Sequence, residues 1–425
     1  MSELIMKEAQ ERDAADPLRG WREKFAHPRG KTGQPLVYLC GHSLGLMPLA
    51  ARNLVEQELD DWAKLAVLGH EGATRPWIPY HENLTAGLAY LAGAQPQEVV
   101  AMNSLTVNLH LMLATFYRPS GQRTRILIES GAFSSDRHAV ASQLAWHGRD
   151  VARDLIELTP EPGSERLSED AIEAYLERHG RETALVLWPG VQFRTGQAFD
   201  LARIVRAAHQ QGCVAGVDLA HSMGNMPLAL HDYDADFAVW CSYKYLNAGP
   251  GAIGGAFVHE RHLERAPRNG LHGWWGHEQS TRFRMEPEFR AQHGAAAWQI
   301  SNPPILSAAP LLASLELFQS AGLPRLREKS IALTAYLERL LLPLAPAVEL
   351  VTPTDPSARG CQLSIRIKGA NRRGHRILER LAELDVICDW REPDVIRVAP
   401  VPLYNTFADV GHFSQRLTQA LREIP

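Results

Sequence analysis

Apolar residues in the middle of the chain occur as short runs, and longer amphipathic stretches separate one run from the next. A short apolar run bounded by polar or turn residues is typical of a buried strand, whereas apolar residues at every third or fourth position indicate a helix. The runs predict strands at Glu98–Met102, Arg125–Ile128, Leu155–Leu158, Ala184–Trp188, Val214–Asp218, Phe237–Cys241 and Ala252–Val258. Helices are expected at Ser134–Trp146, Glu169–Arg178 and Asp200–Gln211. This alternation predicts an α/β fold with a mainly parallel sheet covered on both faces.

The pattern changes beyond about residue 305, where helices and strands no longer alternate regularly. Helices are expected at Ala308–Ser320, Glu328–Leu342, Arg373–Leu384 and Phe407–Ile424, and strands at Val348–Val351, Gln362–Ile367, Val386–Asp389 and Val395–Ala399. This order predicts a smaller α+β domain. We therefore expect an N-terminal arm or junction segment over residues 1–45, a large cofactor-binding α/β domain over 46–305 and a small C-terminal domain over 306–425.

The charge and the cysteine content narrow the class of protein. A net charge of −4 gives no reason to expect nucleic acid or an anionic membrane as a partner. The N-terminal residues are charged and contain no apolar signal core, and a run of about 18 apolar residues occurs nowhere, so neither secretion nor a membrane span is expected. The 5 cysteines lack paired spacing, which is typical of free thiols in a reducing compartment. We expect a cytoplasmic globular protein.

The most informative chemistry lies between residues 213 and 256. Asp218 ends one predicted strand, and Lys244 follows the next one, directly before a glycine-rich segment. In open α/β sheets, ligands bind beyond the carboxyl ends of the strands. An acid and a lysine at that edge suit a pyridoxal phosphate enzyme, because the carboxylate keeps the pyridine nitrogen protonated and the lysine forms the Schiff base that a substrate amine displaces. The alternative is a solvated loop lysine and a turn-forming aspartate.

A series of motifs extends this interpretation over nearly the whole chain. They are YLCGHSLGLMP (38–48), HEGATRPW (70–77), MNSLTVNLHLML (102–113), FSSDRHAVASQLAWHG (133–148), VDLAHSMGN (217–225), WCSYKYLNAGPG (240–251), GWWGHEQSTRF (273–283), ISNPPIL (300–306) and RVAPVPLYN (397–405). Each motif alone is a weak signal, but their set and order resemble the kynureninase family of fold-type-I pyridoxal phosphate hydrolases. The resemblance implies that fold, pyridoxal 5′-phosphate as cofactor, and a homodimer with shared active sites.

The resemblance also implies a cofactor site. Leu105 and Thr106 match residues that contact the cofactor phosphate, which suits a helix start with unpaired N–H groups. Phe133 matches the aromatic residue stacked on the pyridine ring. The other matches are Asp136, an acid of the site; Asp218, the partner of the ring nitrogen; His221, beside the cofactor; Tyr243, at the phosphate; Lys244, the covalent attachment point; and Trp274 and Asn302, which reach a site across the dimer interface.

Substrate-binding residues follow from the same resemblance. Arg397 matches the arginine that holds the substrate α-carboxylate, which suits a planar guanidinium that can donate two parallel hydrogen bonds. A strand arginine on a solvated face is the alternative. His70, Ser301 and Asn302 match the set found in members that prefer 3-hydroxykynurenine, since polar groups can bind the ring hydroxyl. Pro189 is a departure, because some relatives carry a hydroxyl side chain there.

The implied activity is hydrolysis of L-kynurenine or 3-hydroxy-L-kynurenine to anthranilate or 3-hydroxyanthranilate plus L-alanine, and the matched residues favour the 3-hydroxy substrate. Lys244 would remove the Cα proton, and Tyr243 is the candidate donor of the proton that the Cβ carbon later takes. Members of the family serve tryptophan catabolism or NAD biosynthesis through the kynurenine pathway, and the sequence does not distinguish these roles.

Three other hypotheses compete with this interpretation. A cysteine desulfurase-like lyase lacks an obvious catalytic cysteine, because Cys361 and Cys388 are expected in strands. A metal-dependent hydrolase could use Asp218, His221, His231, Asp232 and Asp234, but no helical His-x-x-x-His pair supports it, and we expect no metal. A non-catalytic protein that keeps the cofactor fold is the third reading, against which the intact Lys244, Asp218 and Arg397 argue.

Overall fold

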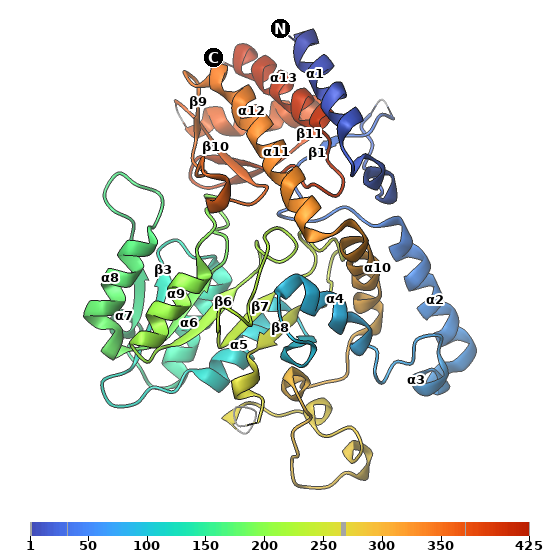
Figure 1. Ribbon diagram of the computed structural model, residues 1–425, viewed down its shortest axis with the longest axis vertical. Helices are drawn as coiled ribbons and strands as arrows, with labels where there is room; N and C mark the ends of the chain where they lie inside the picture. The colour runs from blue at the N-terminus through green and yellow to red at the C-terminus, as the bar shows by residue number, and fades with distance from the viewer. Residues whose placement is uncertain (1, 32, 265–268, 370, 425) are drawn as a thin grey trace.

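The computed structural model describes residues 2–31, 33–264, 269–369 and 371–424. A large part built around one sheet lies below a smaller part that holds both chain ends (Figure 1). The helices are α1 (Ser2–Ala15), α2 (Leu49–Leu65), α3 (Gly69–Gly72), α4 (Glu82–Ala92), α5 (Leu105–Phe116), α6 (Ser134–Trp146), α7 (Val151–Asp154), α8 (Glu169–His179), α9 (Leu201–Gln210), α10 (Ile305–Ala321), α11 (Leu323–Leu341), α12 (Asn371–Glu383) and α13 (Phe407–Glu423).

The large sheet has 7 strands in the order β2-β8-β7-β6-β5-β3-β4. They are β2 (Val99–Ala101), β3 (Arg125–Glu129), β4 (Leu155–Leu158), β5 (Thr183–Pro189), β6 (Val214–Asp218), β7 (Phe237–Trp240) and β8 (Gly255–Val258). Strands β7, β6, β5, β3 and β4 are parallel, and β8 runs antiparallel to both β7 and β2. The predicted mainly parallel sheet is therefore confirmed, and each strand predicted for it occurs within a few residues of its expected bounds.

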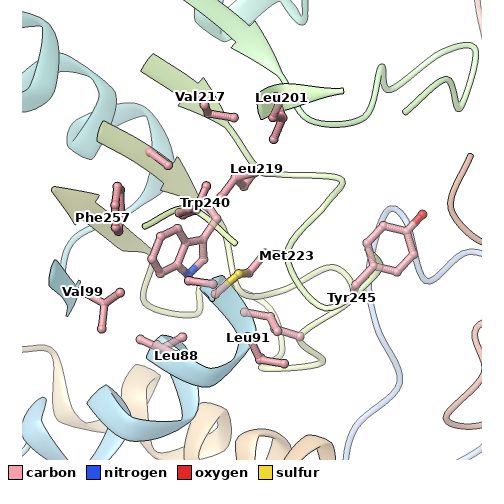
Figure 2. Packing of buried hydrophobic residues seen from close by; sticks show 14 of the residues in the cluster. Leu88, Leu91, Val99, Leu201, Val217, Leu219, Met223, Trp240, Tyr245 and Phe257 are labelled. Carbon is pink, nitrogen blue, oxygen red and sulfur yellow. The ribbon is translucent and has the colours of Figure 1, made fainter. Parts of the chain in front are cut away.

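Side chains on both faces of this sheet are buried, which explains why its strands read as continuous apolar runs. Figure 2 shows Trp240 of β7 between Val217 of β6 and Phe257 of β8, with Leu88 of α4 below them. Each of these side chains is at most 1% exposed. This packing sets the positions of the strand ends, and with them the positions of the residues that follow each strand.

The smaller part contains a 4-stranded sheet in the order β12-β13-β10-β9. Its strands, all antiparallel to their neighbours, are β9 (Val348–Leu350), β10 (Leu363–Ile367), β12 (Asp389–Arg391) and β13 (Val395–Val398). The prediction of a single strand at Val386–Asp389 is wrong, because Cys388 belongs to no strand and separates two short ones. The residues before Cys388 form β11 (Val386–Ile387), which pairs with β1 (Val37–Tyr38) from the N-terminal segment.

The N-terminal segment lies against the smaller part. Helix α1 packs beside α13 (Figure 1), and Arg22 donates hydrogen bonds to the Tyr404 carbonyl and to Asp409 at 2.8 and 2.6 Å. Helix α10 packs against α2 and α4 of the large part, whereas α11 packs against α13. Within the described residues, no single helix is long and apolar enough to cross a membrane, although Ile305–Ala321 and Leu323–Leu344, which meet at 84°, together satisfy the length and composition of a span.

Candidate active site

A cavity of about 140 Å³ opens at the carboxyl ends of β3, β5 and β6 and beside the starts of α5 and α6. This is the edge at which ligands bind in open α/β sheets. Its lining includes eight of the residues matched to the cofactor site: Leu105, Thr106, Phe133, Asp136, Asp218, His221, Tyr243 and Lys244. Residues separated by up to about 140 positions in the sequence therefore meet in one cavity.

Lys244 is buried, with 9% of its surface exposed, and its Nζ lies 3.1 Å from Nε2 of His221. Burial and the nearby Lys244 charge lower the pKa of His221 well below its usual value, so the imidazole is neutral and can accept a hydrogen bond from the amine. Lys244 Nζ also lies over the Phe133 ring, 5.7 Å from its centroid. Among the described residues, no carboxylate forms an ion pair with this amine. A buried lysine held without an ion pair is available to react with a ligand carbonyl.

Three carboxyl groups line the same cavity. Asp218 Oδ1 accepts a hydrogen bond from the Ala220 amide at 2.7 Å. Burial and the neighbouring Asp218 raise the pKa of Asp136 well above its usual value. Burial, supported by Asp218, also raises the pKa of Glu129 to about 8, although a hydrogen bond from Gln192 opposes the shift. A positive charge placed in this cavity would favour the ionised forms of these carboxyl groups.

Glu129 is the functional candidate that the sequence interpretation missed. It ends β3 and lines the cavity with only 3% of its surface exposed. The available signal was a carboxylate directly after the apolar run 126–128, at a predicted strand end. Its carboxyl group, which the shifted pKa keeps protonated at neutral pH, can donate a hydrogen bond inside the cavity.

The start of α5 offers an anion site. Ser104, at the N-cap, has extended backbone and makes no side-chain cap, so the first N–H groups of the helix are not capped by it. Gly254 lies against this turn, since a Cβ there would be 3.1 Å from the Ser104 carbonyl carbon and 3.2 Å from the Leu105 nitrogen. Uncapped N–H groups and the positive end of a helix dipole bind phosphate well.

These features fit pyridoxal phosphate, because the cavity supplies each group that the cofactor needs. Lys244 could provide the amine, Asp218 the acid for the ring nitrogen, and the start of α5 the phosphate site. Phe133 offers an aromatic ring, which itself contacts Phe193 edge-on at 5.1 Å between centroids. The residues present therefore match the chemistry of the cofactor.

Other matched residues lie elsewhere. His70, Trp274 and Asn302 line a second cavity of about 570 Å³, and Ser301 is an exposed neighbour that does not line it. The structure of one chain does not bring this group into the cavity that contains Lys244. Trp274, which lines the second cavity, is 47% exposed.

Arg397 lies on β13 and is 1% exposed, so the alternative of a strand arginine on a solvated face is wrong. Its Nε and Nη2 donate to the two carboxylate oxygens of Asp389 at 2.8 and 2.5 Å, and its Nη1 donates to the Phe193 carbonyl at 2.9 Å. Phe193 lines the first cavity, which places Arg397 directly behind the cavity wall.

The geometry bears on the two other enzyme readings. Burial raises the pKa of the Cys361 thiol to about 12, and the thiol of Cys388 shifts in the same direction, so neither is poised as a nucleophile. Among the described residues, the group whose possible metal-ligand atoms lie within 4.8 Å of one another is Glu98, His231 and His259, not the set with Asp218 and His221 that the metal-dependent alternative would use. The two imidazoles are parallel to within 8°, which does not let one ion lie in both ring planes.

The chain is similar to known proteins in sequence and in structure. The family profile of the kynureninase C-terminal domain matches residues 326–417. The chain is 58% identical over 400 residues to a kynureninase of Xanthomonas campestris pv. campestris (strain B100), covering 94% of each chain. It is 55% identical over 417 residues to a kynureninase of Xanthomonas oryzae pv. oryzae (strain PXO99A), covering 97% of this chain and 98% of that one.

Solved structures share the fold at lower sequence identity. A complex of the cystine C–S lyase C-DES with cysteine persulfide superposes with a TM-score of 0.75 at 20% identity, covering 90% of this chain and 97% of that chain. The cysteine desulfurase CsdA from Escherichia coli gives a TM-score of 0.75 at 20% identity, covering 96% and 99%. The predicted fold-type-I architecture, with a large mainly parallel sheet and a smaller C-terminal part, is confirmed.

Proposed function

The chain belongs to the kynureninase family, and we propose that 3-hydroxy-L-kynurenine is its preferred substrate. It is a pyridoxal phosphate-dependent hydrolase of a carbon–carbon bond. Its reaction releases L-alanine and an anthranilate. The observation that carries the assignment of the site is the buried Lys244 amine, which forms no ion pair with any described residue and lies in the cavity that contains Asp218.

We propose the following roles for the residues of this cavity. Pyridoxal phosphate supplies an electron sink that stabilises negative charge on the substrate carbons. Lys244 would hold the cofactor through its amine, and the same amine, once free, would take the proton from the substrate Cα. Asp218 would keep the ring nitrogen protonated, and the start of α5 would bind the phosphate. His221 hydrogen-bonds the amine of Lys244 and so orients it.

Tyr243 is our proposed proton donor to Cβ. Its ring lies 5.8 Å from Lys244 Nζ, and it lines the cavity. Burial, with a smaller contribution from Cys241, raises the pKa of Tyr243 above its usual value, so the phenol keeps its proton at neutral pH. A protonated hydroxyl beside the reacting carbons can act as a general acid.

We further propose that the second cavity completes the active site of a second copy of the chain. His70, Trp274 and Asn302 gather in a cavity separate from that of Lys244. Exposed apolar side chains, Leu68 at 70% and Phe283 at 61%, line this second cavity, as expected of a surface that a partner covers. In such a homodimer, the imidazole of His70 and the amide of Asn302 would bind the ring hydroxyl.

We propose that Arg397 binds the substrate α-carboxylate. Its buried guanidinium donates to the carbonyl of Phe193, a residue of the cavity wall, and can also donate to an anion.

We propose the cytoplasm as the place of action, because the described cysteines are free thiols. Kynurenine breakdown for tryptophan catabolism or NAD biosynthesis is the proposed pathway context.

The substrate proposal is tested by comparing kcat/KM for L-kynurenine and 3-hydroxy-L-kynurenine. We expect the hydroxylated substrate to be favoured by about ten-fold or more, because polar groups left unpaired disfavour the substrate that lacks the hydroxyl. The Asn302→Ala variant should reduce this preference several-fold. Asn83→Ala, at an exposed amide on α4, is the control and should leave the preference unchanged. Preference for plain L-kynurenine by the unaltered enzyme would contradict the proposal.

A further inference from the structure

The guanidinium of Arg397 is hydrogen-bonded to the carboxylate of Asp389, a residue to which the proposed reaction assigns no role. Asp389 on β12 lies directly opposite Arg397 on β13 in the antiparallel register, so the two side chains share one face of the small sheet. We infer that Asp389 is a positioning residue, which fixes the Arg397 fork so that its free N–H groups receive the substrate α-carboxylate. This inference rests on the carboxylate-binding role proposed for Arg397.

The count of N–H groups supports this arrangement. A guanidinium has five N–H donors in a rigid plane. Asp389 takes one from Nε and one from Nη2, and the Phe193 carbonyl takes one from Nη1. Within the part of the chain that the structure describes, one N–H therefore remains on each of the terminal nitrogens, Nη1 and Nη2. Two terminal N–H groups are what a second carboxylate needs for a bidentate contact.

Asp389 is itself fixed from another part of the chain. Nε2 of His42 lies 3.1 Å from Asp389 Oδ1, and Nη2 of Arg391 lies 3.3 Å from Oδ2. Burial, together with the charges of Arg397 and Arg391, lowers the pKa of His42 to about 4, so its imidazole is neutral at pH 7 and donates through Nε2–H. Burial favours the protonated form of Asp389, but the hydrogen bonds from His42 and Arg397 outweigh it and lower the pKa of the carboxyl group.

Backbone pairing explains how His42 reaches this place. The amide of Leu39 donates to the Ile387 carbonyl at 2.8 Å, and the amide of Ala399 donates to the Leu39 carbonyl at 2.9 Å. The segment before His42 is thus held between the chain near β11 and the chain after β13. His42, Asp389 and Arg397 then form one connected group from three separate segments.

The consequence for binding is orientation. Arg397 is almost fully buried, so water cannot take the place of a hydrogen-bond partner that a misaligned guanidinium loses. With its Nε–Nη2 edge fixed by Asp389, the guanidinium turns its other terminal N–H groups to a constant direction beside Phe193. An interaction of this kind is made equally in the ground state and in the transition state, so its loss raises KM more than it lowers kcat.

The test uses the holoenzyme with Asp389→Asn. This change preserves the side-chain shape but replaces one acceptor oxygen by an amide that cannot accept. We expect KM for L-kynurenine to rise about ten-fold or more while kcat changes less than about three-fold. Titrations followed by cofactor absorbance, without turnover, give the dissociation constants of L-alanine and of L-alaninamide. We expect the variant to lose affinity for L-alanine by the same factor and to keep its affinity for L-alaninamide. The preference for the acid over the amide should therefore collapse.

Asp394→Asn is the matched control. Asp394 lies in the turn between β12 and β13, is 23% exposed against 18% for Asp389, and pairs with Arg194 and Arg366 at 2.8 and 2.5 Å instead of Arg397. We expect it to leave KM and the acid preference unchanged. If Asp389→Asn does not fold, His42→Leu tests the same group, because it removes the hydrogen bond to Asp389 and should raise KM about three-fold.

The outcomes separate this inference from the function on which it rests. Unchanged KM and unchanged acid preference in Asp389→Asn would overturn the positioning role, as would an equal loss in Asp394→Asn. If Arg397→Ala leaves the affinity for L-alanine unchanged, the proposed carboxylate site itself is wrong. If Arg397→Ala weakens L-alanine but Asp389→Asn does not, Arg397 binds the carboxylate and Asp389 does not orient it.

Discussion

Glu129 shows how a single buried carboxyl group makes the stability of this chain depend on pH. Its folded-state pKa of about 8 lies above the usual value of about 4.3 for the unfolded chain. Between these values, the folded protein holds a proton that the unfolded chain has released. The contribution of Glu129 to the free energy of unfolding therefore falls as the pH rises through this range.

We predict that Glu129→Gln removes this dependence. The stability of the variant relative to the unaltered protein should grow from pH 5 to pH 8, by at most about 1.4 kcal/mol per pH unit. Chemical unfolding of the cofactor-free proteins at several pH values measures the difference. Glu177→Gln, on the exposed face of α8, serves as the control. A difference for Glu129→Gln that does not vary with pH would contradict the protonated carboxyl group.

At the same scale, side-chain chemistry could be predicted where a motif carried it. The eight matched residues of the first cavity, Lys244 among them, lie where strand ends and helix starts bring them together. Glu129 and Asp389 were missed for a physical reason, since each acts through a partner, Asp218 or Arg397, that only strand pairing in the folded chain brings to it. Asp389 reads in the sequence as the last residue of a strand, and only the antiparallel pairing of β12 with β13 places it opposite Arg397.

Among the elements, the start of α5 depends on the close approach of the chain before β8. A Cβ on Gly254 would lie 3.0 Å from the Trp240 carbonyl oxygen and close to Ser104 and Leu105, and all of these contacts are with backbone atoms. The first turn of α5 would have to move by a few tenths of an ångström. This turn is the proposed phosphate site, whose N–H groups must point at the anion.

We predict that Gly254→Ala weakens pyridoxal phosphate binding about ten-fold, because shifted N–H groups lose part of their hydrogen bonding to the phosphate. Equilibrium titration of the cofactor-free protein, followed by cofactor absorbance, gives the dissociation constant. Gly20→Ala is the control, since a Cβ there meets no atom within 4 Å. Equal cofactor affinity in both variants would show that the phosphate binds elsewhere.

The elements of the large sheet could be predicted well, because buried parallel strands leave a strong local signal. Strands β4 and β6 and helix α6 have the expected bounds. The prediction was wrong at Val386–Asp389, where β11 pairs with β1 and β12 pairs with β13. This division depends on a partner strand from the N-terminal segment, and a local pattern contains no information about such a distant partner.

For the whole molecule, the arrangement of the two cavities carries the argument. The motifs that contain His70, Trp274 and Asn302 belong to the same family pattern as the motif of Lys244, yet they form a separate cavity in one chain. The exposed apolar residues around them are consistent with a surface covered in a dimer. The sequence could indicate a binding role for these residues only through the family resemblance, because the local pattern of apolar and polar residues does not tell which distant residues share a cavity.

The central claim is that Lys244 and its cavity carry out the hydrolysis. The most direct measurement is the release of L-alanine and anthranilate from L-kynurenine by the holoenzyme and by Lys244→Ala, with the cofactor absorbance recorded before and after borohydride. We predict equal amounts of both products from the unaltered enzyme, bleaching by borohydride, and a loss of about a thousand-fold or more in kcat for the variant. Turnover that persists in Lys244→Ala, or its absence in the unaltered enzyme, would contradict the account.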